Sequence, residues 1–130
     1  MKFFQGIDIV SINRIERLFN KYQNRFIEKI FSTKERELFD KTKRIKFIAN
    51  RFAAKEALVK ALGTGFIKNI NIKEISIIND ELGKPYYEIS GLTKKFIEKR
   101  LNFDKTSFNI TLSDEKEYVV ALATIIINKR

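Results

Sequence analysis

The sequence contains no cysteine and no histidine. The missing cysteines exclude disulfide bonds, thiolate metal sites and a cysteine nucleophile. The missing histidines exclude Ser-His-Asp triads, histidine-ligated zinc hydrolases and histidine proton shuttles. Any catalysis by this chain must therefore use carboxylates, lysine, tyrosine or hydroxyl groups.

Proline and glycine are also scarce, with 1 and 5 residues in a chain of 130, which excludes collagen-like and low-complexity classes. Hydrophobic residues make up 44% of the chain, enough for a packed core. No linker or repeat divides the sequence, so we expect a single domain over residues 1–130. No apolar run approaches the roughly 18 residues of a membrane span, and no signal peptide is recognisable. We therefore expect a cytoplasmic protein that does not bind membranes.

The charge is strongly basic, with 26 Lys and Arg against 16 Asp and Glu, a net charge of +10. Residues 1–60 hold 15 basic and 7 acidic side chains, so most of the excess lies in the first half. Such an excess indicates a polyanionic partner, either nucleic acid or an acidic protein, although part of it is typical of an AT-rich genome.

Periodicity and turn residues predict an α+β chain with an antiparallel sheet and one long central helix. We expect strands over residues 3–10, 70–78, 86–90, 108–113 and 118–127, and helices over 12–26, 32–39, 47–62 and 93–101. A capping box at Ser32 opens the second helix, and glycine at position 63 ends the longest one. Residues 79–85 are predicted to form the turn of a hairpin.

The first predicted helix carries four cations at steps of three or four residues. They are Arg14, Arg17, Lys21 and Arg25. At about 100° per residue, they form one narrow stripe beside the apolar face.

Asp8 is the unusual residue of the first predicted strand, because it lies between two isoleucines and shares a face with Gly6. A carboxylate among apolar neighbours needs a partner or a cation. One interpretation is that Asp8 caps the helix that begins near Ser11. The other is that it holds a cation, with Gly6 leaving room for a close approach.

The longest predicted helix carries two polar pairs, Arg51 with Lys55 and Glu56 with Lys60, about 140° apart around its axis. On a packed helix the two pairs cannot both face bulk water, so one of them should line a cleft or an interface. Glu56 and Lys60 have the spacing of an ordinary ion pair worth about a few tenths of a kcal/mol, which is the simpler interpretation.

Taken together with Asp8, these residues compose a candidate site. Asp8 and Glu56 supply oxygen ligands for a hard cation such as Mg²⁺, leaving its other positions to water and substrate phosphates. Lys60 and the amides of residues 63–65 would lie beside it. The Gly-Thr-Gly segment is not a P-loop, because its glycines follow the helix, where the helix dipole disfavours an anion. Two glycines there are also the ordinary way to end a helix.

Larger motifs resemble those of the bacterial holo-acyl-carrier-protein synthases, a family of 4'-phosphopantetheinyl transferases. The likeness rests on segments 6–10 with 14–15, 51–57 with 60–65, 79–85, 110–114 and 118–123, in the family's order and spacing. It covers almost the whole chain. The resemblance implies the family's α+β fold, assembled as a compact homotrimer with active sites between neighbouring subunits.

The resemblance also implies an activity. Members of the family transfer the 4'-phosphopantetheine group of coenzyme A to a serine of apo acyl carrier protein, in fatty acid biosynthesis, using Mg²⁺ and releasing adenosine 3',5'-bisphosphate. The implied catalytic and metal-binding residues are Asp8 and Glu56, with Lys60 as a catalytic contact to the pyrophosphate. The implied coenzyme A contacts are Lys60, Gly63, Thr64, Gly65, Lys84 and Pro85.

One departure from the family concerns the general base. Many relatives have histidine near the positions of Asn109 and Asp114, whereas this chain has none. The serine proton is therefore expected to pass to a metal-bound water, to Glu56 or to Asp8. Catalysis would rest mainly on positioning and on charge neutralisation at the β-phosphate.

The basic stripe formed by Arg14, Arg17, Lys21 and Arg25 is predicted to dock the acidic carrier protein. A nucleic-acid-binding module is the rival from another class, but the chain has no recognisable binding motif and its aromatic residues follow core-like spacing. We expect no nucleic-acid partner. A relative that kept the fold and lost the activity is a further alternative, against which the intact Asp8, Glu56 and Lys60 count.

Overall fold

The computed structural model describes residues 1–128 and has the predicted α+β class. The elements in chain order are β1 (Lys2–Ser11), α1 (Ile12–Tyr22), α2 (Asn24–Ile30), α3 (Thr33–Thr42), α4 (Ile45–Leu62), β2 (Ile75–Asn79), β3 (Pro85–Ile89), α5 (Gly91–Arg100), β4 (Thr106–Asp114) and β5 (Tyr118–Ile127). Short 3-10 helices cover Ile72–Glu74 and Phe103–Lys105. Over residues 1–128, none of the helices has the length and apolar composition needed to cross a bilayer.

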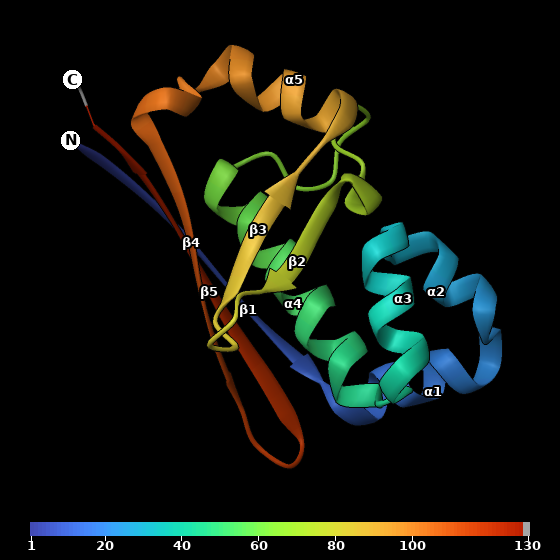
Figure 1. Ribbon diagram of the computed structural model, residues 1–130. Coiled ribbons are helices and arrows are strands. Elements are labelled where there is room, and N and C mark those ends of the chain that lie inside the picture. Colours follow the sequence, from blue (N-terminus) through green and yellow to red (C-terminus); the bar gives the residue numbers. More distant parts are fainter. Residues whose placement is uncertain (129–130) are drawn as a thin grey trace.

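Helix α4 is the predicted central helix and lies between two antiparallel sheets (Figure 1). One sheet has the strand order β1-β5-β4, and the other is the β2-β3 hairpin, so the predicted antiparallel sheet is divided in two. Most side chains of α4 are buried, on every side of the helix. A helix that is apolar nearly all round must be covered on more than one face, which explains the two sheets.

Strand β1 packs very closely on α4 at Gly6. A Cβ atom added at this position would lie within 3 Å of backbone atoms of Ala57 and Ala61. The close approach expected at Gly6 is therefore made by helix α4. The register of β1 against β5, in which Gly6 is opposite Ala123, keeps small residues under the helix on both strands.

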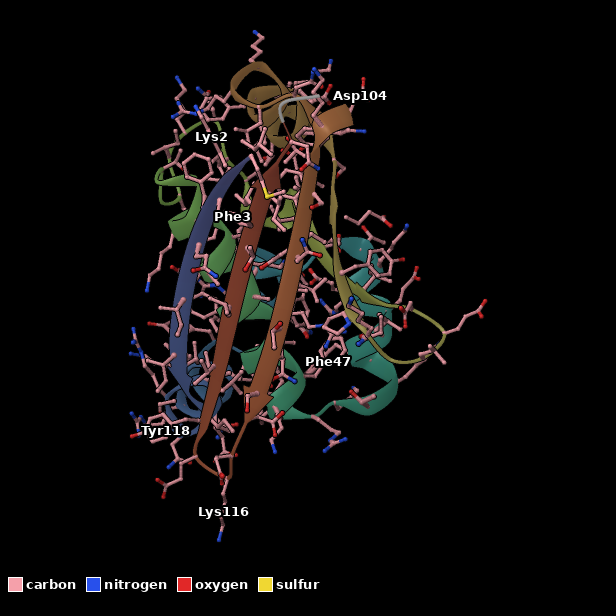
Figure 2. The ribbon with its side chains drawn as sticks, turned by 90° about the vertical axis from the view of Figure 1, so that its left-hand side faces the viewer. Lys2, Phe3, Phe47, Asp104, Lys116 and Tyr118 are labelled. Atoms are coloured by element: carbon pink, nitrogen blue, oxygen red, sulfur yellow. The ribbon has the colours of Figure 1, made fainter. Side chains whose placement is uncertain are left out.

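The opposite face of the three-stranded sheet carries apolar side chains that are exposed to solvent. Figure 2 looks onto this face, and within residues 1–128 no helix lies over it. Its β1 residues Phe3, Ile7 and Ile9 are each at least 60% exposed. Their cross-strand partners on β5 share the same face and are only partly buried; they are Ile126, Leu122 and Val120.

The prediction of one helix over residues 12–26 is wrong in one respect, because the chain forms two helices that are separated at Gln23. Gln23 has φ 51° and ψ −128°, and its N–H donates to the carbonyl oxygen of Phe19 at the end of α1. On one continuous helix Ile15 and Ile27 would point about 120° apart. The break allows both isoleucines to be buried, at 2% and 0% exposure.

The other local predictions differ from the structure mainly at element ends. Helix α4 begins two residues earlier than predicted and α5 begins at Gly91 instead of residue 93. Residues 70–78 are not one strand, because a 3-10 helix precedes β2 and is capped by the side chain of Asn71. The capping box of Ser32 with Glu35 is confirmed, as is the left-handed conformation of Gly63 at φ 77°.

Candidate active site

The inward face of β1 brings Asp8 against helix α4. The side chain of Asp8 is 14% exposed, and its Oδ1 accepts a hydrogen bond of 3.0 Å from Nζ of Lys60. Lys60 also donates to the carbonyl oxygen of Ile7 at 3.1 Å. Asp8 does not cap α1, because the hydroxyl of Ser11 accepts from the N–H of Arg14 at that position. The partner that Asp8 needs is therefore a lysine on the neighbouring helix.

Glu56 lies one turn before Lys60 on α4 and faces the same site. Burial raises the pKa of the Glu56 carboxyl, the charge of Asp8 raises it further, and Lys60 opposes both effects. Among the described residues, the ion pair of Lys60 is with Asp8, and not the ordinary i,i+4 pair with Glu56. Asp8 and Glu56 thus repel each other, and Lys60 offsets this repulsion only in part.

A cleft of about 420 Å³ opens beside these carboxylates. Its polar lining includes Asp8, Glu56, Arg14 and Tyr118, and its apolar lining includes Phe52 and Leu18. Arg14, predicted only as a docking residue, therefore also borders the site. No local pattern points to Tyr118, which Figure 2 shows at the lower end of the sheet; it reaches this position because β5 pairs it with Ser11.

The carboxylates of Asp8 and Glu56 fit a magnesium ion whose remaining coordination positions are filled by water and a ligand. Within residues 1–128 no group of three or more acidic, cysteine or histidine side chains gathers as a closed metal cage. Two carboxylates leave most of an octahedral coordination shell to water and phosphate oxygens, which is how Mg²⁺ is commonly bound. The mutual repulsion of Asp8 and Glu56 gives a physical reason for a cation there.

Apart from Lys60, which contacts Asp8, the predicted coenzyme A contacts do not line this cleft. Gly63 and Gly65, with φ 77° and 63°, follow the C-terminal end of α4, and the hydroxyl of Thr64 donates to the carbonyl oxygen of Gly65 at 2.8 Å. Lys84 and Pro85 lie on the β2-β3 hairpin. One copy of the chain does not bring this hairpin into the cleft of Asp8 and Glu56.

The second polar pair of α4 faces the interior. Arg51 is 5% exposed and Lys55 is fully buried, on the side of the helix toward α3 and β2. Glu56, in contrast, lines the cleft. Of the pair Glu56 and Lys60, Glu56 therefore lines a cleft, whereas the pair Arg51 and Lys55 avoids water by burial.

The basic stripe is shorter than predicted. Arg14, Arg17 and Lys21 lie on α1, but the break at Gln23 places Arg25 on α2. Arg25 instead borders a shallow pocket at the junction of the two helices, together with Leu18, Tyr22, Phe26 and Lys29. The prediction of a single helical stripe of four cations is therefore wrong.

Asn109 and Asp114, the positions at which the family resemblance led us to compare histidines, also lie away from this cleft. Asn109 is exposed on β4 opposite Thr124 of β5. Asp114 ends β4 and forms an ion pair of 3.3 Å with Lys46 at the start of α4. Neither side chain lines the cleft of Asp8 and Glu56.

Comparison with known proteins defines the class of protein. The sequence model described as the 4'-phosphopantetheinyl transferase superfamily matches residues 5–123. The chain is 44% identical over 117 residues to the holo-[acyl-carrier-protein] synthase of Pelagibacter ubique, covering 89% of this chain and 90% of that protein. The chain belongs to the holo-[acyl-carrier-protein] synthase family of this superfamily.

Solved structures have the same fold. The crystal structure of holo-[acyl-carrier-protein] synthase from Neisseria meningitidis matches with a TM-score of 0.87 and 33% identity, covering 95% of this chain and 97% of that one. The Bacillus anthracis enzyme in complex with coenzyme A (3',5'-ADP) matches with a TM-score of 0.78 and 33% identity, covering 96% of each chain.

Proposed function

We propose that the protein, as one transferase domain over residues 1–130, transfers the 4'-phosphopantetheine group of coenzyme A to a serine of apo acyl carrier protein. The products are holo carrier protein and adenosine 3',5'-bisphosphate, and the setting is fatty acid biosynthesis in the cytoplasm. Family membership supports this reaction. The observation that carries it is the meeting of Asp8 from β1 and Glu56 from α4 beside one cleft.

Asp8 and Glu56 are the residues that would hold Mg²⁺. When bound, this ion supplies charge neutralisation at the diphosphate oxygens. Lys60 contributes a further positive charge and contacts a phosphate oxygen. The serine oxygen forms a bond to the β-phosphorus while the bond from that phosphorus to the bridging oxygen breaks. Within the chain, the carboxylates of Glu56 and Asp8 are the candidate acceptors of the serine proton.

We assign coenzyme A binding to Lys60, Gly63, Thr64, Gly65, Lys84 and Pro85. These residues lie on different sides of α4, since Lys60 faces β1 whereas the hairpin that carries Lys84 and Pro85 packs on the opposite side. A nucleotide that contacts both sets is most simply held between two copies of the chain.

The proposed assembly is a homotrimer with its active sites between subunits. The exposed apolar face of the three-stranded sheet supports self-association, because monomers rarely leave such a face open to water. The carrier protein would dock on Arg14, Arg17 and Lys21 of α1, with Arg25 on α2, and Arg14 also borders the cleft. An acidic carrier would be drawn to these charges before it enters the site.

Mass spectrometry of an apo carrier protein incubated with the enzyme, Mg²⁺ and coenzyme A tests this function. The wild type should add the mass of phosphopantetheine, whereas Asp8→Asn and Glu56→Gln should not, although both stay folded by circular dichroism. Glu98→Gln on the exposed side of α5 is the matched control and should keep full activity. Absence of the increment with the wild type would overturn the function. Full activity in both cleft variants would overturn the metal site.

A further inference from the structure

The side chain of Arg51 is buried, and no carboxylate of residues 1–128 forms an ion pair with it. Its guanidinium carbon lies 3.8 Å from the centroid of the Phe47 ring, and its Nη2 donates to Oδ1 of Asn79 at 2.6 Å. Its Nε has no hydrogen-bond partner among the described residues. Burial lowers the pKa of Arg51, and the charge of Glu35 opposes that shift. The guanidinium is thus held mainly by an aromatic ring and a neutral amide.

This arrangement is not one that stability alone explains. Burying a charge against a neutral partner is unfavourable, and an apolar side chain of similar size commonly serves a core at least as well. Buried polar groups do, in contrast, fix how one element is placed against another. The hydrogen bond of Arg51 to Asn79 joins α4 to the β2-β3 hairpin, which is therefore the element that Arg51 can fix.

Asn79 connects Arg51 to the turn of the β2-β3 hairpin. Its Nδ2 donates to the carbonyl oxygen of Gly83 at 2.9 Å. Lys84 is held on both sides by Asp80: the Lys84 N–H donates to Oδ1 of Asp80 at 2.9 Å, and the Lys84 carbonyl accepts from the Asp80 N–H at 2.8 Å. The N–H of Gly83 in turn donates to the carbonyl oxygen of Asp80 at 2.9 Å, so hydrogen bonds connect helix α4 to the backbone of Lys84 through Asn79, Gly83 and Asp80.

We infer that Arg51 and Asn79 are positioning residues for coenzyme A binding. They fix the turn that carries Lys84 and Pro85 against the same rigid helix that carries Glu56 and Lys60. This inference rests on the proposed function, in which the turn and the helix both contact coenzyme A. Arg51 and Asn79 themselves need not touch the ligand, since they act through the backbone of the turn.

The same hairpin offers a matched control. The hydroxyl of Tyr87 on β3 donates to the carbonyl oxygen of Ala54 on α4 at 2.7 Å. Tyr87→Phe therefore removes one hydrogen bond between the same two elements without touching the turn. A second variant, Asn79→Asp, keeps an acceptor for Arg51 but loses the donor to Gly83.

The experiment measures coenzyme A affinity by calorimetry, together with kcat, both KM values and the unfolding midpoint. Asn79→Ala and Asn79→Asp should each weaken coenzyme A binding by about tenfold, with kcat and the KM for carrier protein nearly unchanged, because a loosened turn must be ordered on binding. Asn79→Asp should keep the wild-type midpoint, and Tyr87→Phe should lower the midpoint while leaving coenzyme A affinity intact.

Two results would overturn the inference while leaving the function in place. One is wild-type coenzyme A affinity in both Asn79 variants of an active enzyme. The other is an equal loss of affinity in Tyr87→Phe and Asn79→Ala, which would mean that general loosening of the hairpin is responsible. A wild type that neither binds coenzyme A nor modifies the carrier would instead overturn the proposed function and the inference with it.

Discussion

The carboxylate of Glu35 and the ammonium of Lys55 lie 2.6 Å apart, and neither side chain has any exposed surface. Glu35 also accepts from the backbone N–H groups of Ser32 and Ile77, at 3.0 Å each. Lys55 also donates to two backbone carbonyl oxygens, those of Ile30 and Ile72. This one pair therefore joins α3, α4 and β2, and it fixes the rotation of the helix that carries Glu56.

Lys55→Met should destabilise the protein strongly, because Glu35 would be left as a buried charge without its partner. Losses of about 3–5 kcal/mol are typical when one member of a buried pair is removed. Adding Glu35→Gln to Lys55→Met should recover much of the loss, since the orphaned charge is then gone. Urea unfolding of the two single variants and the double variant measures this coupling. Strictly additive losses would contradict it.

Gly6→Ala should separate β1 from α4, because the added methyl group meets the backbone of Ala57 and Ala61. We expect a loss of about 3 kcal/mol in the free energy of unfolding, as for severe overpacking. Gly63→Ala is the matched control: its methyl group meets open space, and only the positive φ of 77° is unfavourable, at about 1–2 kcal/mol. If the two variants are equally stable, close packing at Gly6 is not what holds the strand.

Local signals predicted most of the fold and part of the site. The capping box of Ser32 and the glycine at position 63 mark helix ends because the chemistry that ends a helix lies within a few residues. Asp8 could be singled out because a carboxylate among apolar neighbours is costly unless it has a partner. Glu56 could be singled out because two polar pairs on one packed helix cannot both face bulk water.

Long-range partners could not be predicted in this way. Arg51 donates to Asn79, 28 residues away, and Lys55 pairs with Glu35, 20 residues away. Helical periodicity therefore shows two polar residues without showing that they are buried. The break at Gln23 involves neither proline nor glycine and arises from burying residues on both sides of it. Tyr118 reaches the cleft only through strand register.

Glu74 should make stability depend on pH. Its carboxylate accepts from the hydroxyl and N–H of Thr93 at 2.7 and 3.0 Å and from the N–H of Leu92 at 3.2 Å, at the start of α5. The hydroxyl bond, followed by the backbone bonds, lowers the pKa of Glu74 below its ordinary value of 4.5. A carboxyl with a lowered pKa stabilises the fold above its unfolded-state pKa, and this contribution is lost as the pH falls through the folded-state pKa.

Glu74→Gln should therefore lower the urea midpoint more at pH 7 than at pH 3. Thr93→Val, which removes the largest cause of the shift, should reduce the same pH dependence. Equal midpoint differences between wild type and Glu74→Gln at the two pH values would show that the capping bonds do not favour the ionised carboxyl.

Glu56→Gln should stabilise the protein when divalent cations are removed with a chelator. Burial and the charge of Asp8 both raise the pKa of Glu56, so its ionised form opposes folding at neutral pH. Added Mg²⁺ should raise the melting temperature of the wild type and have little effect on the variant, because binding to the folded state stabilises it. A variant that melts below the wild type in chelator would contradict the repulsion between the two carboxylates.

Reversing the charges of Arg14 and Lys21 should weaken carrier binding by about tenfold or more and coenzyme A binding much less. Both residues lie on α1 before the break at Gln23, and Arg14 borders the cleft. The matched control reverses Lys94 and Lys95 on α5, which changes the net charge equally at a site distant from α1. The affinity for apo carrier protein is measured for each variant at low and at high salt. Salt weakens general electrostatic attraction to a similar extent in the α1 and α5 variants, so a loss confined to the α1 variant marks a local docking surface. Equal losses of affinity in the α1 and α5 variants would mean that the overall charge of +10, and not a surface on α1, attracts the carrier protein.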